Sequence, residues 1–182
     1  MATAKKMYTR RGDGGETGLL YGGRVSKADP RCEAYGTLDE AVSVMGLARA
    51  LSVKERVQSV LLDLQKEALI LGGELAIDTD YYSKYLKHFE PVTGEMVTRL
   101  EEVTDDIASK VDMPREFIMP GGTPAAAAID MARSVVRRAE RRTVALRDQG
   151  LVTNEQIIRY LNRLSSLLFV LARYEEQEES KG

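Results

Sequence analysis

Five arginines stand within the ten residues from Arg133 to Arg142, a density that could serve an anionic ligand. On a helix, at about 100° per residue, five charged side chains of this region fall in one stripe about 100° wide. They are Asp130, Arg133, Arg137, Glu140 and Arg141. Taken by itself, the stripe is better explained as a solvated helix face braced by pairs such as Arg137 with Glu140. A binding role requires an anion held by residues from elsewhere in the sequence.

The segment 9–18, TRRGDGGETG, offers a place for such an anion because it combines four glycines with two threonines. Glycines allow consecutive backbone N–H groups to converge on phosphate oxygens, and threonine hydroxyls add further donors. The segment is not a P-loop, which would end in Gly-Lys-Ser/Thr before a helix, whereas Gly18 leads into Leu19. A flexible tail explains the composition equally well. The basic residues Arg24 and Lys27 beyond it fit either interpretation.

A third stretch, residues 116–123 (EFIMPGGT), runs from an apolar patch directly into the expected start of a helix. A helix N-terminus offers free N–H groups and the positive end of the helix dipole. Phe117 places a bulky aromatic ring just before that start. The alternative is that Phe117 belongs to the core, as most lone phenylalanines do.

Helices must position these stretches, because residues after Glu33 follow a 3.6-residue hydrophobic period and residues 9–30 do not. We expect five helices and no strand. Their approximate ranges are 35–51, 53–77, 91–111, 124–149 and 154–174. Thr123 and Pro124 suit the cap and first position of the fourth helix, and Gly150 suits its end. Mostly short connections predict an all-α, up-and-down bundle with the apolar fifth helix at its centre.

The 182 residues are expected to form a single domain. Its parts are an N-terminal loop over 1–32, a helical bundle over 33–174 and a disordered acidic tail over 175–182. A net charge of -2 argues against nucleic acid as the main partner. No apolar run approaches the roughly 20 residues that span a bilayer, and residues 1–6 lack a signal-peptide core, so we expect a cytoplasmic protein.

Cysteine and histidine each occur once, as Cys32 and His88. The chain can therefore form neither an internal disulfide nor a Cys/His zinc site. Neither residue is assigned a role, and most metalloenzyme classes are excluded on this ground.

Taken together and in order, these stretches resemble the PduO-type ATP:cob(I)alamin adenosyltransferases over nearly the whole chain. The matching strings are residues 9–17, 22–27, 33–40, 117–123, 132–141 and 160–165. No single string is decisive, but the ordered set is specific. The resemblance implies a ferritin-like, five-helix bundle with an ordered glycine-rich N-terminal loop. It also implies a homotrimer that binds ATP and a corrinoid (cobalamin or a precursor) between subunits.

Position in these strings implies which residues bind ATP, with Mg²⁺ held mainly by phosphates and water and no protein metal site. The implied ATP contacts are Thr9, Arg10, Gly12, Asp13, Gly14, Gly15, Thr17, Arg24, Lys27, Arg137, Glu140, Arg141 and Asn162. The implied catalytic residues are Lys27, Phe117, Arg137 and Asn162. Asp39 and Arg133 are implied as an ion pair at the subunit boundary, and Phe117 as the residue facing the corrinoid. Gly14 and Ser166 depart from the family pattern, which often has a larger polar residue and commonly an aspartate there.

The implied reaction is an in-line attack of Co(I) on C5′ of ATP that expels the whole triphosphate. Because cobalt is the nucleophile, no protein base is needed. Lys27, Arg137, the loop amides and Mg²⁺ would stabilise the charge on the leaving group. Phe117 would displace axial ligands from the lower face of the corrinoid, which eases reduction of Co(II). A separate reductase must supply the electron, since no flavin or nicotinamide motif is visible, and an adenosylcobalamin-dependent enzyme is the expected recipient.

Two other classes of function are compatible with parts of the sequence. One is a non-catalytic ATP or corrinoid sensor, or a delivery module on the same fold, against which the retention of Lys27, Arg137 and Asn162 argues. The other is a helical interaction protein whose arginines are surface charge, which predicts no stabilisation by ATP. The sequence does not specify which corrinoid is preferred.

Overall fold

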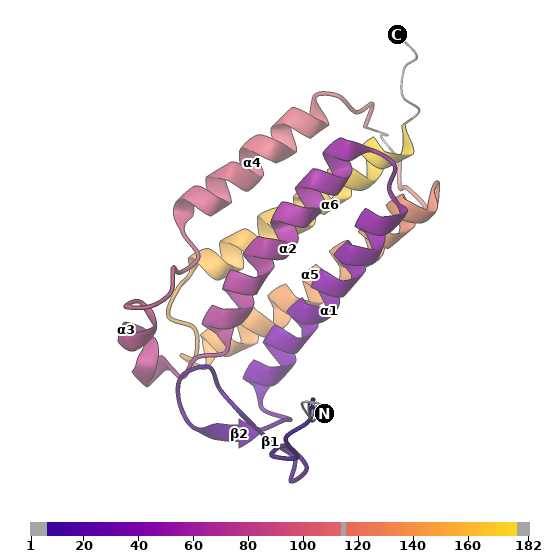
Figure 1. Ribbon diagram of the computed structural model, residues 1–182. Coiled ribbons are helices and arrows are strands. Elements are labelled where there is room, and N and C mark those ends of the chain that lie inside the picture. Colours follow the sequence, from indigo (N-terminus) through magenta and orange to yellow (C-terminus); the bar gives the residue numbers. More distant parts are fainter. Residues whose placement is uncertain (1–6, 114–115, 178–182) are drawn as a thin grey trace, which may run out of the picture.

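The computed structural model of the chain describes residues 7–113 and 116–177 and is mostly helical (Figure 1). The elements are β1 (Glu16–Gly18), β2 (Arg24–Ser26), α1 (Pro30–Leu51), α2 (Glu55–Leu75), the 3-10 turn η1 (Thr79–Tyr81), α3 (Tyr82–Tyr85), α4 (Gly94–Ala108), α5 (Pro124–Asp148) and α6 (Gln156–Glu176). The long helices run alongside one another, and the two strands lie at one end of the bundle (Figure 1). The expected helical fold is thereby confirmed in its broad form. The disordered tail predicted over 175–182 starts too early, because α6 continues to Glu176 and Glu175 is buried, and residues 178–182 lie outside the described residues.

Two features correct the expectation of five helices without strands. β1 and β2 pair as an antiparallel hairpin in which Thr17 faces Val25. Each strand has three residues, too few to produce a readable alternation in the sequence. The second feature is α3, a sixth α-helix among the described residues, which has only four residues and falls in the segment expected to be a loop.

The start of α1 lies before the predicted boundary because a capping motif precedes it. The Asp29 side chain accepts a hydrogen bond from the Arg31 N–H at 2.8 Å, and Pro30 occupies the first helical turn. Arg31 is buried, and its Nε donates to the carbonyl of Ile77 at 3.2 Å. The bundle therefore begins at residue 30, with the start of α1 tied to the segment that follows α2.

Other helix boundaries shift by a few residues. α2 covers 55–75 rather than 53–77, and α4 covers 94–108 rather than 91–111. Thr93 caps α4 by accepting the Met96 N–H at 3.3 Å, so Pro91 lies before the helix and not in its first turn. α5 begins at Pro124 behind the Thr123 cap, and Gly150 follows its end at φ 72°, as the sequence predicted.

The core lies along α6, which packs against α5 and α4 and touches α2. α1 completes the bundle by packing against α5 and α2. The predicted apolar face of α5 is buried, comprising Ile129, Ala132, Val135, Val136 and Ala139. On α6, the fully buried side chains include Leu161, Leu164, Leu167, Leu168 and Leu171. Each such side chain contributes about 1.5–3 kcal/mol through burial, so α6 holds the other helices in place.

A buried carboxylate closes the end of the bundle near the hairpin. Glu74 of α2 accepts hydrogen bonds from the Tyr82 hydroxyl at 2.6 Å, the Val92 N–H at 2.8 Å and the Asn154 amide at 2.9 Å. Burial, together with the bond to Glu74, raises the pKa of Tyr82 above its ordinary value. This cluster joins α2, α3, the residue Val92 before α4 and the residue Asn154 before α6. None of the described helices has both the length and the apolar character needed to cross a membrane.

Candidate ATP and corrinoid site

The glycine-rich loop is folded back on itself by its own backbone. The Gly15 N–H donates to the Gly12 carbonyl at 3.2 Å, and the Lys27 N–H donates to the Gly15 carbonyl at 2.9 Å. Arg10 lies in the left-handed region at φ 59°, as does Gly15 at 80°. In the structure, the segment 9–18 turns at residues 12–15, enters β1 and is connected through Lys27 to the end of β2.

Arg24 acts inside this loop. Its Nη2 donates to the carbonyls of Arg11 at 2.7 Å and Glu16 at 3.2 Å, and its Nε lies 3.3 Å from the Glu16 carboxylate. These contacts connect both strands with the segment before them. The structure thus gives Arg24 a bracing position, which differs from a side chain extended toward a ligand.

Lys27 lies directly against the glycine-rich turn. A Cβ placed on Gly12 would come within 3.0 Å of the Lys27 Nζ, so glycine at this position allows the ammonium group to approach. A Cβ on Gly14 would meet nothing within 4 Å, so the larger polar residue common in the family would fit there. Other predicted ATP contacts of the loop reach its surface: Thr9, Arg10, Asp13 and Gly15 are exposed, and Thr17 is half-buried.

The loop is docked on the end of α2 by backbone and aromatic contacts. The Leu20 N–H donates to the Ala76 carbonyl at 2.9 Å, and the Asp78 N–H donates to the Tyr21 carbonyl at 2.9 Å. The Tyr21 ring packs edge-on against Phe89 with the centroids 6.2 Å apart. These contacts fix the loop at the end of the bundle where α2 ends and α1 begins (Figure 1).

The arginines of α5 divide into two sets. Arg138 pairs with Glu40 of α1, and Arg142 pairs with Glu33 of α1. Arg137 and Arg141 are exposed, and no carboxylate within the described ranges pairs with either. The alternative in which Glu140 braces Arg137 is therefore not what the structure shows. The guanidinium groups of Arg137 and Arg141 are therefore available on one helix face to bind an anion.

Glu140 instead contacts α6. The Asn162 amide donates to the Glu140 carboxylate at 3.0 Å, and the Asn162 carbonyl oxygen accepts from Arg163 at 2.8 Å. Asn162 is exposed and Glu140 partly so. The structure thus brings together the predicted residues of α5 and α6. Ser166 lies one turn along, with its hydroxyl 3.4 Å from the Asn162 backbone carbonyl.

The predicted corrinoid residue, Phe117, is fully exposed at 106%, and Met119 is 87% exposed. The alternative that Phe117 belongs to the core is therefore wrong. Both residues lie in the loop before α5, at the end of the bundle opposite the glycine-rich loop. The antiparallel pairing of Arg142, near the end of α5, with Glu33, near the start of α1, establishes this arrangement. A single chain does not bring Phe117 and the loop together.

The predicted ion pair between Asp39 and Arg133 does not form within the chain. Asp39 is exposed on α1, beside a pocket of about 360 Å³ between α1 and α2. Arg133 lies 3.6 Å from Asp130 of its own helix. Because Arg138 pairs with the neighbouring Glu40, the antiparallel register carries Arg133 away from Asp39.

Several polar groups were missed by reasoning from the sequence. Asp130 was placed in the solvated stripe, but it is buried and bonds to Arg173 of α6. The sequence signal that could have indicated this pair was Arg173, a charged residue within the most apolar helix, α6. The Tyr35 hydroxyl donates to Cys32 Sγ at 3.0 Å, and burial, reinforced by this bond, raises the pKa of Tyr35 to about 12. In the part of the chain that the structure describes, no cluster of three potential metal ligands gathers.

The fold and these surfaces define a mostly helical protein with a small two-stranded hairpin and an exposed arginine face on α5. A family model described as Cobalamin adenosyltransferase matches residues 7–175. The chain belongs to this family.

Curated relatives and solved structures agree with this assignment. A corrinoid adenosyltransferase of Bacillus subtilis is 42% identical over 172 residues, covering 92% of this chain and 85% of that protein. The corrinoid adenosyltransferase PduO of Salmonella typhimurium is 38% identical over 94% of this chain, but the chain spans only 50% of the length of that relative.

Among solved structures, a phenylalanine-to-alanine variant of a PduO-type ATP:corrinoid adenosyltransferase from Lactobacillus reuteri, complexed with cobalamin and ATP, has a TM-score of 0.82. It is 34% identical, covering 94% of this chain and 93% of that chain. An arginine-to-lysine variant complexed with ATP gives a TM-score of 0.81 at 33% identity. The family and the enzyme class predicted from the sequence are confirmed.

Proposed function

We propose that this chain transfers the 5′-deoxyadenosyl group of ATP to the Co(I) centre of a corrinoid and releases triphosphate. The observation that carries the proposal is the open face of α5. Arg137 and Arg141 are left without carboxylate partners among the described residues, whereas two neighbouring arginines are paired with α1. Next to them, the Glu140–Asn162 pair offers an acceptor and an amide to the polar groups of a nucleoside.

The triphosphate is bound in this proposal by the glycine-rich loop, with Lys27 placed against Gly12 as its cation. Exposed backbone groups and the hydroxyls of Thr9 and Thr17 add hydrogen bonds to phosphate oxygens. Mg²⁺ bound together with ATP would supply further positive charge, held by phosphates and water because the described residues gather no acidic cluster for it. The loop itself carries two carboxylates, Asp13 and Glu16, and Glu16 is paired with Arg24.

The chemistry proposed for the site is a single displacement. An electron pair of Co(I) forms the Co–C5′ bond while the C5′–O bond breaks, and that bonding pair stays on the departing triphosphate. No proton is transferred, so the protein needs no general base. Arg137 and Lys27 stabilise the charge that the leaving group acquires, and their placement before reaction avoids reorganisation during the step.

The complete site is proposed to form between subunits of a homotrimer. The glycine-rich loop and the segment before α5, which carries Phe117, lie at opposite ends of the bundle (Figure 1), so a neighbour is needed to bring ATP and the corrinoid together. Arg133 supports this arrangement because 30% of its side chain is exposed and its carboxylate neighbour among the described residues, Asp130, lies as far as 3.6 Å from its Nε. Asp39 of the adjacent subunit is the proposed partner, and Phe117 is proposed to exclude an axial ligand from the corrinoid.

The direct test is an anaerobic incubation of the protein with ATP, Mg²⁺ and chemically reduced cobalamin, followed by absorption spectroscopy. Formation of the alkylated, light-sensitive product supports the proposal. Saturable binding of ATP and cobalamin without product would indicate the sensor or delivery module instead. Absence of both binding and product would favour the remaining alternative, a helical interaction protein. With Co(II) as the starting state, a separate cytoplasmic reductase is required, and an adenosylcobalamin-dependent enzyme is the proposed recipient.

A further inference from the structure

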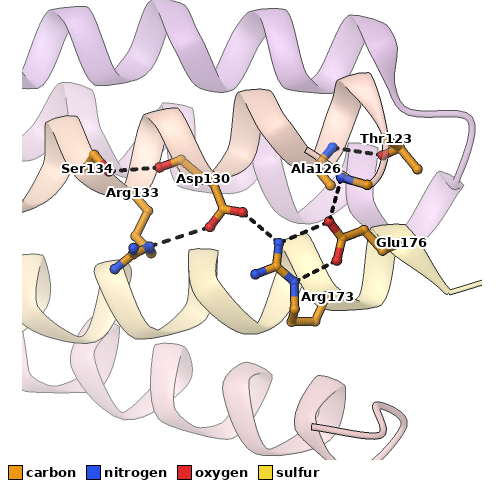
Figure 2. A network of polar contacts seen from close by, with 8 residues as sticks. Thr123, Ala126, Asp130, Arg133, Ser134, Arg173 and Glu176 are labelled. Atoms are coloured by element: carbon orange, nitrogen blue, oxygen red, sulfur yellow. Dashed lines mark hydrogen bonds and ion pairs between the residues drawn. The ribbon is translucent and has the colours of Figure 1, made fainter. Parts of the chain in front are cut away.

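Arg173 is a buried arginine that the proposed chemistry does not use. It stands near the end of α6 with 4% of its surface exposed, and Asp130 of α5 is equally buried. The Arg173 Nη2 donates to the Asp130 carboxylate at 2.6 Å, and its Nε lies 2.8 Å from the Glu176 carboxylate (Figure 2). Two carboxylates therefore surround one guanidinium group, as a buried charge requires.

Glu176 extends this network to the loop that carries Phe117. Its Oε1 accepts a hydrogen bond from the Gly122 N–H at 3.1 Å. A Cβ on Gly122 would lie 2.7 Å from that same oxygen, so a larger residue here would have to displace the Glu176 carboxylate. No other side chain in the described residues bonds to the backbone of the turn 117–122. The turn is thus tied to α6 by one carboxylate.

The end of α6 is itself held firmly, so Glu176 is a fixed point. The Ser52 hydroxyl donates to Glu175 at 2.7 Å, and the Lys54 ammonium donates to the carbonyl of Tyr174 at 2.8 Å. Arg173, one turn earlier on the same helix, pairs with Glu176. Three consecutive residues are anchored to different neighbours, which leaves little freedom for the carboxylate that meets Gly122.

We propose that Glu176, held by Arg173, is a positioning residue that sets the Phe117 turn for binding the corrinoid. The inference rests on the proposed function, in which Phe117 faces the corrinoid. Because Phe117 is fully exposed, packing within the chain does not hold its ring, and the turn must be fixed through its backbone. Asp130 also faces Arg133 at 3.6 Å, so the same network reaches the proposed subunit boundary (Figure 2).

The test compares Glu176→Ala with Glu176→Gln, which keeps an oxygen acceptor for the Gly122 N–H. Glu102→Ala is the control, since Glu102 is exposed on α4. Three quantities are measured: amide hydrogen exchange of the 117–122 turn, the Kd for cob(II)alamin with ATP present, and the KM for ATP. We expect Glu176→Ala to accelerate exchange at Gly122 and to weaken cob(II)alamin binding about tenfold, because a displaced turn misplaces the ring. The KM for ATP should stay unchanged, and Glu176→Gln should restore most of the binding.

Gly122→Ala provides an independent perturbation, because the added methyl group pushes the Glu176 carboxylate away while the Arg173–Asp130 pair is retained. Gly94→Ala, where a Cβ meets nothing within 4 Å, is its matched control. Unchanged cob(II)alamin binding in both Glu176→Ala and Gly122→Ala would overturn the proposal, as would an equal loss for ATP and corrinoid in parallel with melting temperature. Failure of the wild-type protein to turn over would refute the proposed function instead, since exchange and cob(II)alamin binding are measured without turnover.

Discussion

Replacing Arg137 by alanine tests the assignment of the open α5 face most directly. Arg137 is exposed and unpaired among the described residues, so its removal should change the free energy of unfolding by no more than about 0.5 kcal/mol. A charge-assisted contact that strengthens as triphosphate departs contributes about 2.7–4 kcal/mol to the barrier. At 1.36 kcal/mol per factor of ten, kcat should fall by about 10²–10³-fold.

Arg138→Ala is the matched control, since Arg138 is the adjacent residue but turns toward Glu40 of α1. Loss of this surface ion pair should cost about 0–1 kcal/mol of stability and leave kcat nearly unchanged. Both variants are assayed anaerobically with chemically prepared cob(I)alamin, saturating ATP and Mg²⁺, and their melting temperatures are compared. Equal losses of kcat in the two variants would refute the assignment of Arg137, rather than Arg138, to the ligand-binding face of α5.

Three further perturbations test other parts of the site. Phe117→Ala should retain much of its rate with cob(I)alamin but lose most of it with Co(II) and a reductase, and its melting temperature should hold because the ring is exposed; a parallel loss with both cobalt states would contradict the axial-ligand role. Asp39→Ala should weaken the proposed trimer in sedimentation by about 3 to 5 kcal/mol, the cost of breaking a buried intersubunit pair, and normal mass with normal activity would exclude that pair. Gly12→Ala should displace the Lys27 ammonium and raise the KM for ATP, whereas Gly14→Ala, which meets no neighbour, should not; similar values for the two variants would argue against the lysine contact.

Local signals predicted α5 well, because its start and end depend on neighbouring residues. Thr123, Pro124 and Gly150 each act within one turn of the helix, and the structure uses all three. The same kind of signal was present at Asp29 and Pro30 but was overlooked, which placed the start of α1 too late. The hairpin was not predictable in this way, because three-residue strands have no period and depend on contacts with the end of α2.

The positions of charged residues around α5 correctly predicted most of its exposed face. The prediction failed where another helix packs against that face. Arg137 and Arg141 are exposed, but Asp130 of the same stripe is buried because α6 covers it and presents Arg173. Periodicity within one helix indicates which residues share a face. The helix packed against that face determines whether the residues are exposed to solvent. The separation of Phe117 from the glycine-rich loop is likewise a property of the tertiary arrangement.

The packing of α1 against α5 also bears on the order in which the chain can fold during synthesis. α2 to α4 lie between these helices in the sequence, so α1 leaves the ribosome well before its main partner exists. At about 5–20 residues per second, it waits for several seconds with only α2 available to cover its apolar face. α6, which lies along the core, is made after α1 to α5. A nascent chain that stops before residue 156 therefore lacks the helix on which α4 and α5 pack, and it presents their apolar faces to chaperones or to aggregation.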